Sequence, residues 1–373
     1  MIEIVVAVRS VDIIGRVHLA LAERRPLALL DPNHAPAELE RQRALLAATT
    51  LPADTAFVLF TSGSTAQPRG VVLSRGAVEA ACAASAAHLG WRAGDRWLLA
   101  LSLAHTGGLA VVVRCWFAGK PVVMPVDDDR VASALEDCAL ASLVPTQLAS
   151  LLDDPSWRPP PQLRAVLVGG AGTPPSLLDA AAAREVPFLT TYGMTETFGQ
   201  VATAPLARAG DPRALPVPLP SVIIEATPRI TVAGPTLATC YLDGAPIAPR
   251  FTTADLGELS PAGLHVIGRA DDVIVTGGDN VQPADVEAAL VATPGVRAAC
   301  AFGVPDERWG AIVGAAIVVD ASFDLVAATR RWHELPPRLR PRRLAIVDEL
   351  PRLPSGKIDR RAAARLATDA VDY

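Results

Sequence analysis

The chain has 373 residues, of which 50% are hydrophobic, and a formal net charge of −5 at pH 7. A chain of this length can form two domains around a large buried core. Its charge argues against nucleic acid as a partner, because proteins that bind nucleic acid usually carry a basic surface.

The apolar segments are short and interrupted by proline, glycine or charged residues, so we expect no segment that spans a membrane. The N-terminus lacks a basic region followed by an apolar stretch and a cleavage site, and we therefore expect a cytoplasmic protein. Five cysteines are widely spaced and form no Cys-x-x-Cys pair, which predicts buried, reduced thiols rather than a zinc site or a disulfide framework.

The first 56 residues predict a strand at residues 4–8 and helices near residues 17–22 and 37–47, without a recognisable motif. Two short β-prone runs, residues 57–60 and 70–73, then flank a polar loop. The loop supplies hydroxyl groups, one glycine and one guanidinium: Thr61, Ser62, Gly63, Ser64, Thr65 and Arg69. Such donors suit a polyphosphate, although small polar residues are equally typical of an ordinary hairpin turn.

Neither standard phosphate-binding motif fits the sequence. A P-loop ends in Gly-Lys-Ser/Thr, and neither Lys120 nor Lys357 completes one. A dinucleotide fingerprint needs a third glycine where Pro175 stands. The loop, followed by Pro68-Arg69-Gly70, instead resembles the phosphate loop of the adenylate-forming superfamily, which includes acyl-CoA synthetases, firefly luciferase and peptide-synthetase adenylation domains. In most of that superfamily a longer region precedes this loop, so the chain looks truncated at its front.

Ser74 is well placed to cap a helix that ends near Leu89, with Gly90 as its stop. Residues 95–100 predict a strand, and His105 follows, with two glycines that open the next helix. The ends of strands are where α/β folds place ligands, but from the residues alone we favour a helix-capping role for His105. The resemblance implies instead that His105 lies at the mouth of the acyl pocket.

Strand-like and helix-like segments alternate from residue 121 to 191, which predicts a mostly parallel sheet covered by helices. One strand ends at Gly169, Gly170 and Ala171, where small residues let a flat group approach the backbone.

The next strand ends in the hexapeptide that starts at Tyr192. The tyrosine can stack on a base, Thr195 can donate to a phosphate, and Glu196 can hold Mg²⁺. A Tyr-Gly turn before a capped helix would look the same. However, the hexapeptide is similar to the adenine and magnesium motif of the superfamily in order and spacing.

From about residue 221 short strands and turns predict a small barrel-like or antiparallel part. Within it, residues 251–257 resemble the ribose-binding segment of the superfamily, and Asp255 matches its aspartate. Aspartate suits that role because a carboxylate can accept two hydrogen bonds from a diol. Ala254 replaces the usual glycine there, and a solvated turn aspartate is the alternative.

Residues 268–278 read as a strand between turns, and the resemblance makes them the hinge of a mobile cap. It places Arg269 near the ribose, makes Asp271 the pivot, and lets Gly277 and Gly278 line the tunnel for the thiol of CoA. We therefore expect a core domain at residues 1–270 and a small α+β cap at residues 271–373.

Near the end, Lys357 would ordinarily be a solvated charge, but the matching lysine of the superfamily enters the site and neutralises the reacting carboxylate and phosphate.

The predicted fold is α/β, with a large N-terminal domain of mostly parallel sheets covered by helices, a small barrel-like part and a mobile C-terminal domain. The resemblance implies an AMP-forming acid-thiol ligase that uses ATP, Mg²⁺ and CoA. Residues 102–109, 144–148 and 192–201 further resemble the 2-succinylbenzoate-CoA ligases of menaquinone biosynthesis. Arg114 could meet a second carboxylate, but we expect it on the surface.

Alternatives remain open at this point. The chain could activate another aryl or fatty acid, could adenylate without transfer to CoA, or could bind nucleotide without catalysis, since Ala66, Arg69 and Ala254 depart from the usual pattern. We expect a small-molecule carboxylate as substrate and consider a homodimer.

Overall fold

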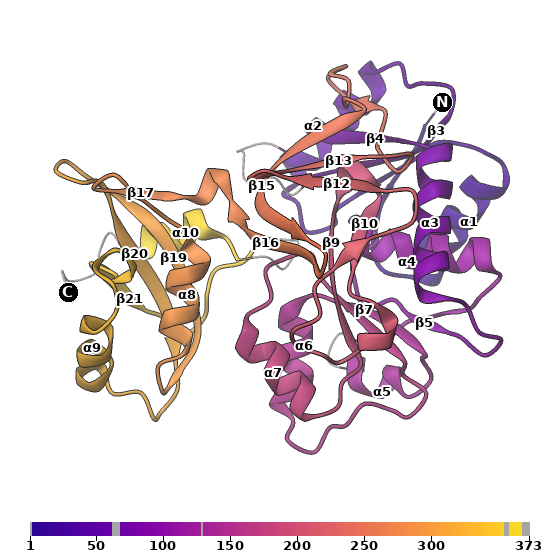
Figure 1. The fold of residues 1–373 in the computed structure, drawn as a ribbon. Coiled ribbons are helices and arrows are strands. Elements are labelled where there is room, and N and C mark those ends of the chain that lie inside the picture. The colour runs from indigo at the N-terminus through magenta and orange to yellow at the C-terminus, as the bar shows by residue number, and fades with distance from the viewer. Residues whose placement is uncertain (1, 62–67, 128–129, 354–357, 368–373) are drawn as a thin grey trace.

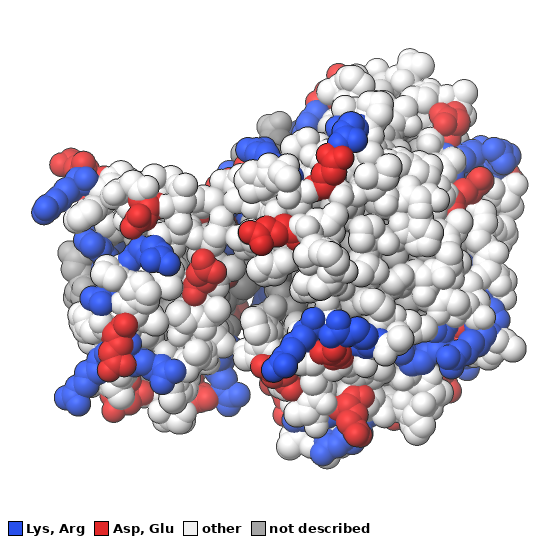
Figure 2. Space-filling view, in the orientation of Figure 1, with Lys and Arg blue, Asp and Glu red and all other residues white. Residues whose placement is uncertain are grey.

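The computed structural model describes residues 2–61, 68–127, 130–353 and 358–367. The chain forms a large body and a smaller unit that is made by its C-terminal part (Figure 1). Figure 2 shows acidic and basic side chains interspersed over both parts, with a notch in the surface between them. Within the described ranges, no helix is long and apolar enough to cross a membrane.

The first sheet of the body carries the phosphate-loop hairpin. Its strand order is β1 (Glu3–Val6), β2 (Leu27–Leu30), β3 (Thr55–Phe60), β4 (Gly70–Ser74) and β14 (Cys240–Tyr241). The first three strands are parallel, and β4 is antiparallel to both β3 and β14. Helices α1 (Val11–Ala22) and α2 (Pro36–Ala48) connect the first strands; α2 lies where the sequence predicts it, whereas α1 begins well before its predicted start at residue 17. The predicted hairpin is confirmed.

The second sheet follows the predicted alternation of strands and helices. Its order is β11 (Val217–Pro218), β10 (Gly199–Thr203), β9 (Phe188–Met194), β8 (Ala165–Val168), β7 (Leu140–Leu143), β5 (Trp97–Leu98) and β6 (Val122–Val123). The strands from β6 to β9 are parallel, whereas β10 and β11 are antiparallel. Helices α5 (Val131–Leu135), α6 (Pro145–Asp153) and α7 (Pro175–Ala183) connect them. The expected strand at residues 95–100 is shorter than predicted.

Two helices bury their apolar residues between these sheets. Helix α3 (Arg75–Leu89) begins where the Ser74 hydroxyl accepts a hydrogen bond from the N–H of Ala77, and it ends at Gly90, whose φ is 61°. Helix α4 (Thr106–Ala118) is buried along most of its length, in one apolar cluster with both sheets. The start of α4 is thereby fixed at the junction of the sheets.

The remaining part of the body is antiparallel, as expected. Its order is β12 (Ile223–Ala226), β13 (Arg229–Ala233), β15 (Arg250–Ser260) and β16 (Gly263–Arg269). The described cysteines are free and four of them are buried, while Cys240 is half-buried. This agrees with the prediction of reduced thiols.

The smaller unit has its own sheet and apolar core. Strands β17 (Ile274–Thr276), β18 (Asp279–Val281), β19 (Val296–Asp306), β20 (Gly310–Val319) and β21 (Arg343–Ile346) pack with α8 (Pro283–Val291), α9 (Leu325–His333) and α10 (Arg360–Leu366). The α/β body with an α+β C-terminal unit confirms the predicted fold class. The mobility of this unit and the boundary at residue 270 remain predictions.

The two units touch where the side chain of Gln282 rests on Gly268. A Cβ atom at position 268 would lie 2.4 Å from Oε1 of Gln282. That oxygen is buried and has no hydrogen-bond partner within the described ranges. A larger residue at position 268 would therefore displace the Gln282 side chain.

Candidate active site

The structure brings together three of the predicted nucleotide contacts. The Tyr192 hydroxyl donates to Oδ2 of Asp255 at 2.7 Å, and Nη1 of Arg269 lies 3.3 Å from Oδ1. Asp255 and Arg269 face each other in the register of β15 and β16, so the backbone sets their spacing. Burial and the Asp255 carboxylate raise the pKa of Tyr192, which keeps its hydroxyl a donor at neutral pH. Burial opposes the charge of Arg269, but Asp255 and Asp271 outweigh it and raise its pKa.

The segment after Tyr192 is not the capped helix of the alternative interpretation but a short 3-10 turn (Thr195–Thr197), after which β10 returns antiparallel to β9. The Thr197 hydroxyl fixes this turn by donating to the carbonyl of Gly199 at 2.8 Å. Gly193 is required because a Cβ there would lie 1.9 Å from that same carbonyl oxygen. Thr195 and Glu196 are thus held on a tight turn at the end of β9.

Part of the phosphate loop can be placed. Thr61 and Arg69 close its base, since the N–H of Thr61 donates to the carbonyl of Arg69 and the N–H of Arg69 donates to the Thr61 hydroxyl. The guanidinium of Arg69 pairs with Asp243 at 2.8 Å. The predicted contacts Ser62, Gly63, Ser64 and Thr65 lie outside the described residues.

Tyr241, which the sequence interpretation missed, connects Arg69 to Glu196. Its hydroxyl donates to Oε1 of Glu196 at 3.0 Å, and the guanidinium carbon of Arg69 lies 3.6 Å from the centre of its ring. Within the described part of the chain, no group of three or more potential ligands gathers around one metal position. A single carboxylate such as Glu196 nevertheless fits Mg²⁺, which usually takes one or two carboxylates together with substrate phosphates.

Gly169 lies where β8 approaches β9. A Cβ at this position would lie 2.6 Å from Cγ2 of Thr191, so only glycine fits. Gly170 has a φ of 80°, and Ala171 is exposed beside it. This turn leaves bare backbone next to the segment that leads into Tyr192.

His105 is the N-cap residue of α4 and faces an aspartate that the sequence interpretation did not single out. Its Nε2 lies 3.1 Å from Oδ2 of Asp31, close enough for an ion pair but not aligned as a hydrogen bond. Asp31 directly follows the buried strand β2 and is 3% exposed. Burial would raise its pKa, but His105 and the N–H of Asn33 outweigh burial and hold the pKa of Asp31 below its usual value.

This arrangement predicts the effect of Asp31→Asn. A carboxyl group whose pKa is lowered by folding stabilises the protein above the pKa it has when unfolded, and that stabilisation is lost as the pH falls through the lower folded value. We expect the variant to lose about 1–2 kcal/mol of unfolding free energy at pH 7. The difference should shrink as the pH falls below about 4, where the unfolded carboxyl group becomes protonated.

Urea unfolding of both proteins between pH 7 and pH 3 measures this difference. Asp137→Asn is the matched control, because Asp137 is exposed and lies 3.9 Å from Arg96 in a loose ion pair. We expect almost no effect from it. A difference for Asp31→Asn that stayed constant down to pH 3 would show that the charge of Asp31 is not its source.

The expectation that Arg114 lies on the surface is wrong. Arg114 is 5% exposed, on a helix whose neighbouring residues are buried as well. Its Nε has no hydrogen-bond partner and no carboxylate pairs with it among the described residues, while Trp97 lies under the guanidinium at 5.6 Å. Burial lowers its pKa.

The guanidinium of Arg114 is directed toward the segment that follows Glu196. A Cβ on Gly199 would lie 3.8 Å from Nη2 of Arg114 and 4.0 Å from Cβ of Thr106, the first residue of α4. The side chain of Arg114 therefore lies close to both the start of α4 and the β9–β10 turn.

The C-terminal candidates lie in the smaller unit. Gly277 and Gly278 form the turn between β17 and β18 with φ values of 59° and 92°, and a Cβ on Gly277 would meet the ring of Trp309 at 2.6 Å. Lys357 lies outside the described residues. Arg360, which begins α10, pairs with Glu287 and lies 3.8 Å from Asp272 beside the predicted pivot.

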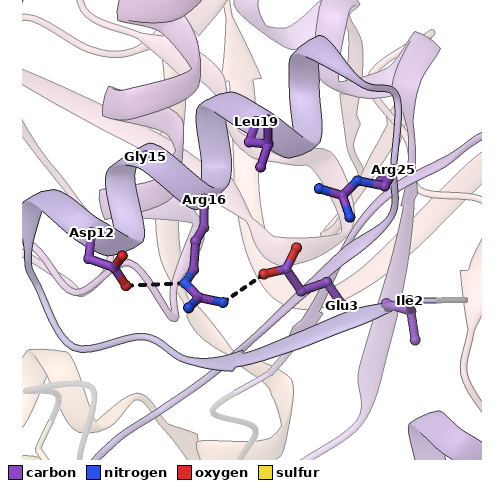
Figure 3. Close-up of a pocket in the computed structure, with 7 residues that line it drawn as sticks. All are labelled: Ile2, Glu3, Asp12, Gly15, Arg16, Leu19 and Arg25. Atoms are coloured by element: carbon purple, nitrogen blue, oxygen red, sulfur yellow. Dashed lines mark hydrogen bonds and ion pairs between the residues drawn. The ribbon is translucent and has the colours of Figure 1, made fainter.

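An open groove of about 690 Å³ lies elsewhere, between β1 and α1. Figure 3 shows Arg16 between Glu3 and Asp12, with ion pairs of 2.9 and 3.1 Å. None of the predicted site residues lines this groove. The groove is therefore separate from the candidate active site.

Comparisons with known proteins identify the family to which the chain belongs. Residues 9–242 match the family described as AMP-binding enzyme, and residues 285–357 match the AMP-binding enzyme C-terminal domain. A probable 2-succinylbenzoate-CoA ligase of Mycobacterium tuberculosis is 39% identical over 345 residues, which cover 86% of this chain and 86% of that protein. The 2-succinylbenzoate-CoA ligase of Bacillus licheniformis is 35% identical over 82% of this chain and 69% of its own length.

Solved structures give the same result. The o-succinylbenzoate CoA synthetase of Bacillus subtilis, in complex with its acyl-adenylate intermediate, is 26% identical and superposes with a TM-score of 0.85 over 96% of this chain and 87% of that chain. The same enzyme in complex with ATP and a magnesium ion gives a TM-score of 0.84 over 97% of this chain and 88% of that chain.

Proposed function

Because this chain belongs to the AMP-binding enzyme family, we propose that it is an ATP-dependent carboxylate-CoA ligase whose substrate is 2-succinylbenzoate. It is an AMP-forming acid-thiol ligase that uses ATP, Mg²⁺ and CoA. We further propose that it acts in the cytoplasm and serves menaquinone biosynthesis.

Apolar side chains exposed on α1 and α4 (Leu19, Trp116 and Phe117) favour a homodimer, which light scattering would detect.

The observation that carries the choice of substrate is the buried guanidinium of Arg114. A buried charge without a counter-charge is costly, so this position favours a ligand that brings an anion. 2-Succinylbenzoate has two carboxylates, and one can pair with Arg114 while the other reacts. Benzoate and fatty acids have only the carboxylate that reacts.

The reaction has two steps. A substrate carboxylate is already ionised at neutral pH, so it bonds to the α-phosphorus of ATP without a general base, and the bond to pyrophosphate breaks. The sulfur of CoA then bonds to the acyl carbon of the adenylate with release of the thiol proton, and the bond from that carbon to the oxygen of AMP breaks. Catalysis is mainly positioning and charge stabilisation, with Mg²⁺ neutralising phosphate charge.

The described residues suit the nucleotide half of this site. We assign the adenine to Tyr192 and the bare backbone of Gly169, Gly170 and Ala171. We assign the ribose to Asp255 and Arg269, because each Asp255 oxygen keeps a second lone pair beside its protein partner.

The remaining roles concern phosphates, acyl group and thiol. We assign the phosphates to Arg69, Thr195 and the loop at residues 61–65, and Mg²⁺ to Glu196. His105 would face the reacting carboxylate, while Gly277 and Gly278 would line the path of CoA. Lys357 would neutralise charge where the carboxylate meets the α-phosphate.

ATP-pyrophosphate exchange with a panel of acids, with and without CoA, tests the proposal. We expect 2-succinylbenzoate to be preferred over benzoate and medium-chain acids, and CoA to give the thioester. Equal exchange across the panel would favour another aryl- or fatty-acid ligase. Exchange without any thioester would indicate adenylation alone, and no exchange with any acid would indicate a nucleotide-binding homologue.

A further inference from the structure

Tyr241 stands on a strand whose position is fixed against the exit of the phosphate loop. Strand β14 pairs with β4, with Tyr241 opposite Val71, and the N–H of Leu242 donates to the carbonyl of Gly70 at 2.8 Å. A Cβ on Gly70 would lie 2.3 Å from Cδ1 of Leu242, so the Leu242 side chain packs directly on Gly70. The backbone at residue 241 therefore has little freedom relative to Arg69.

The face of the tyrosine ring holds Arg69. The guanidinium carbon lies 3.6 Å from the ring centre, and Nη2 lies 2.8 Å from Oδ2 of Asp243, which is two residues beyond Tyr241. A guanidinium over an aromatic face is attracted by the negative face of the ring. The Tyr241 ring and the Asp243 carboxylate together orient the otherwise flexible side chain of Arg69. That side chain remains 45% exposed and can still contact an anion.

The hydroxyl of the same side chain holds Glu196. It donates to Oε1 at 3.0 Å, and the N–H of Ala238 donates to the backbone carbonyl of Glu196 at 2.7 Å. A tyrosine hydroxyl carries one proton that it can donate, and here that proton is directed to the Glu196 carboxylate. One short segment thus fixes both the backbone and the carboxylate of Glu196.

We propose that Tyr241 is a positioning residue that sets Glu196 and Arg69 in register for a magnesium-bound nucleoside triphosphate. Its hydroxyl orients the carboxylate that receives Mg²⁺, and its ring orients the guanidinium that receives the phosphates. This inference rests on the proposed function only as far as ATP and Mg²⁺, not on the identity of the acid. A partner of this kind, one step behind a metal ligand, commonly affects metal affinity by about 10- to 100-fold.

Two substitutions separate the two contacts. Tyr241→Phe keeps the ring over Arg69 and removes the hydrogen bond to Glu196, whereas Tyr241→Leu removes both. Calorimetry measures ATP binding with EDTA and at increasing Mg²⁺ concentrations, so the readout does not depend on turnover. Thr231→Val is the control for loss of a hydroxyl, since its partner Thr252 lies on the exposed surface of β15.

For Tyr241→Phe we expect unchanged ATP binding in EDTA. The Mg²⁺ concentration that gives half of the magnesium-dependent increase in ATP affinity should be about tenfold higher than in the wild type. For Tyr241→Leu we expect that shift together with weaker ATP binding in EDTA. Thr231→Val should match the wild type. The KM for ATP should follow the binding data in each variant.

Normal magnesium dependence in Tyr241→Phe would overturn the role of the hydroxyl, and equal ATP binding in both variants would overturn the role of the ring. A change confined to the melting temperature would show a structural role and would also overturn the proposal. If the wild type lacked magnesium-dependent ATP binding, the positioning role and the proposed function would fail together. A wild type that binds magnesium and ATP but ignores 2-succinylbenzoate would refute only the choice of substrate.

Discussion

Replacing Arg114 with methionine is expected to make the ligand-free protein more stable and to remove most of its activity toward 2-succinylbenzoate. The guanidinium is buried and has no carboxylate partner among the described residues, so it destabilises the unliganded fold. Methionine is unbranched, of similar length and apolar, and can occupy the same space on α4. The free energy of unfolding should rise by about 1–3 kcal/mol.

Activity should change in the opposite direction. If a substrate carboxylate is the counter-charge of Arg114, its loss should cost about 2–4 kcal/mol in kcat/KM, roughly 30- to 1,000-fold. Binding of ATP should be unaffected. Urea unfolding and steady-state kinetics on the same preparations measure both effects.

Arg96→Met is the matched control, because Arg96 is exposed and only loosely paired with Asp137 at 3.9 Å. It should leave stability and kcat/KM within error of the wild type. Unchanged kcat/KM in Arg114→Met would contradict the proposed pairing with substrate. A clear loss of stability in the ligand-free variant would instead mean that the guanidinium is already satisfied within the protein.

Replacing Lys357 with alanine is expected to abolish most adenylation while sparing the second half-reaction. The matching lysine of the superfamily neutralises the carboxylate and the α-phosphate as they meet, which is charge that develops only in the first step. By analogy with a lost oxyanion donor, the cost is about 2–4 kcal/mol, or roughly 30- to 1,000-fold in the rate of adenylation. Thioester formation from supplied acyl-adenylate should change much less, because a rotation of the proposed mobile cap would remove the lysine before that step.

The only other lysine provides the control. Nζ of Lys120 donates to the backbone carbonyls of Arg92 and Ala93 at 2.7 and 2.9 Å, so Lys120→Ala should lower stability by about 1 kcal/mol. It should slow neither half-reaction selectively. Equal losses in both half-reactions for Lys357→Ala would exclude the assigned role.

Local signals in the sequence were sufficient for the elements that hold the phosphate loop. The Ser74 cap and the Gly90 stop depend on neighbouring residues, so they could be predicted without knowledge of the fold. The contact between Tyr192 and Asp255 could be expected only because the whole motif resembles a known family. No pattern in either segment points to the other.

The missed residues have contacts that only the folded chain creates. Asp31 and His105 meet because the end of β2 lies beside the start of α4. Tyr241 reaches Glu196 because β14, which comes much later in the chain, pairs with β4 in the first sheet. Arg114 was misplaced because arginines are usually exposed. The signal was nonetheless present, since residues 108–115 of α4 contain no other charged side chain and a helix that is apolar all round is buried.

At the joint between the two units, the amide oxygen of Gln282 lies against Gly268, shut away from water and from any described donor. An unsatisfied acceptor of this kind costs about 1–3 kcal/mol. The angle seen between body and cap therefore carries a built-in penalty. A rotation of the cap that exposed this oxygen to water would remove that cost.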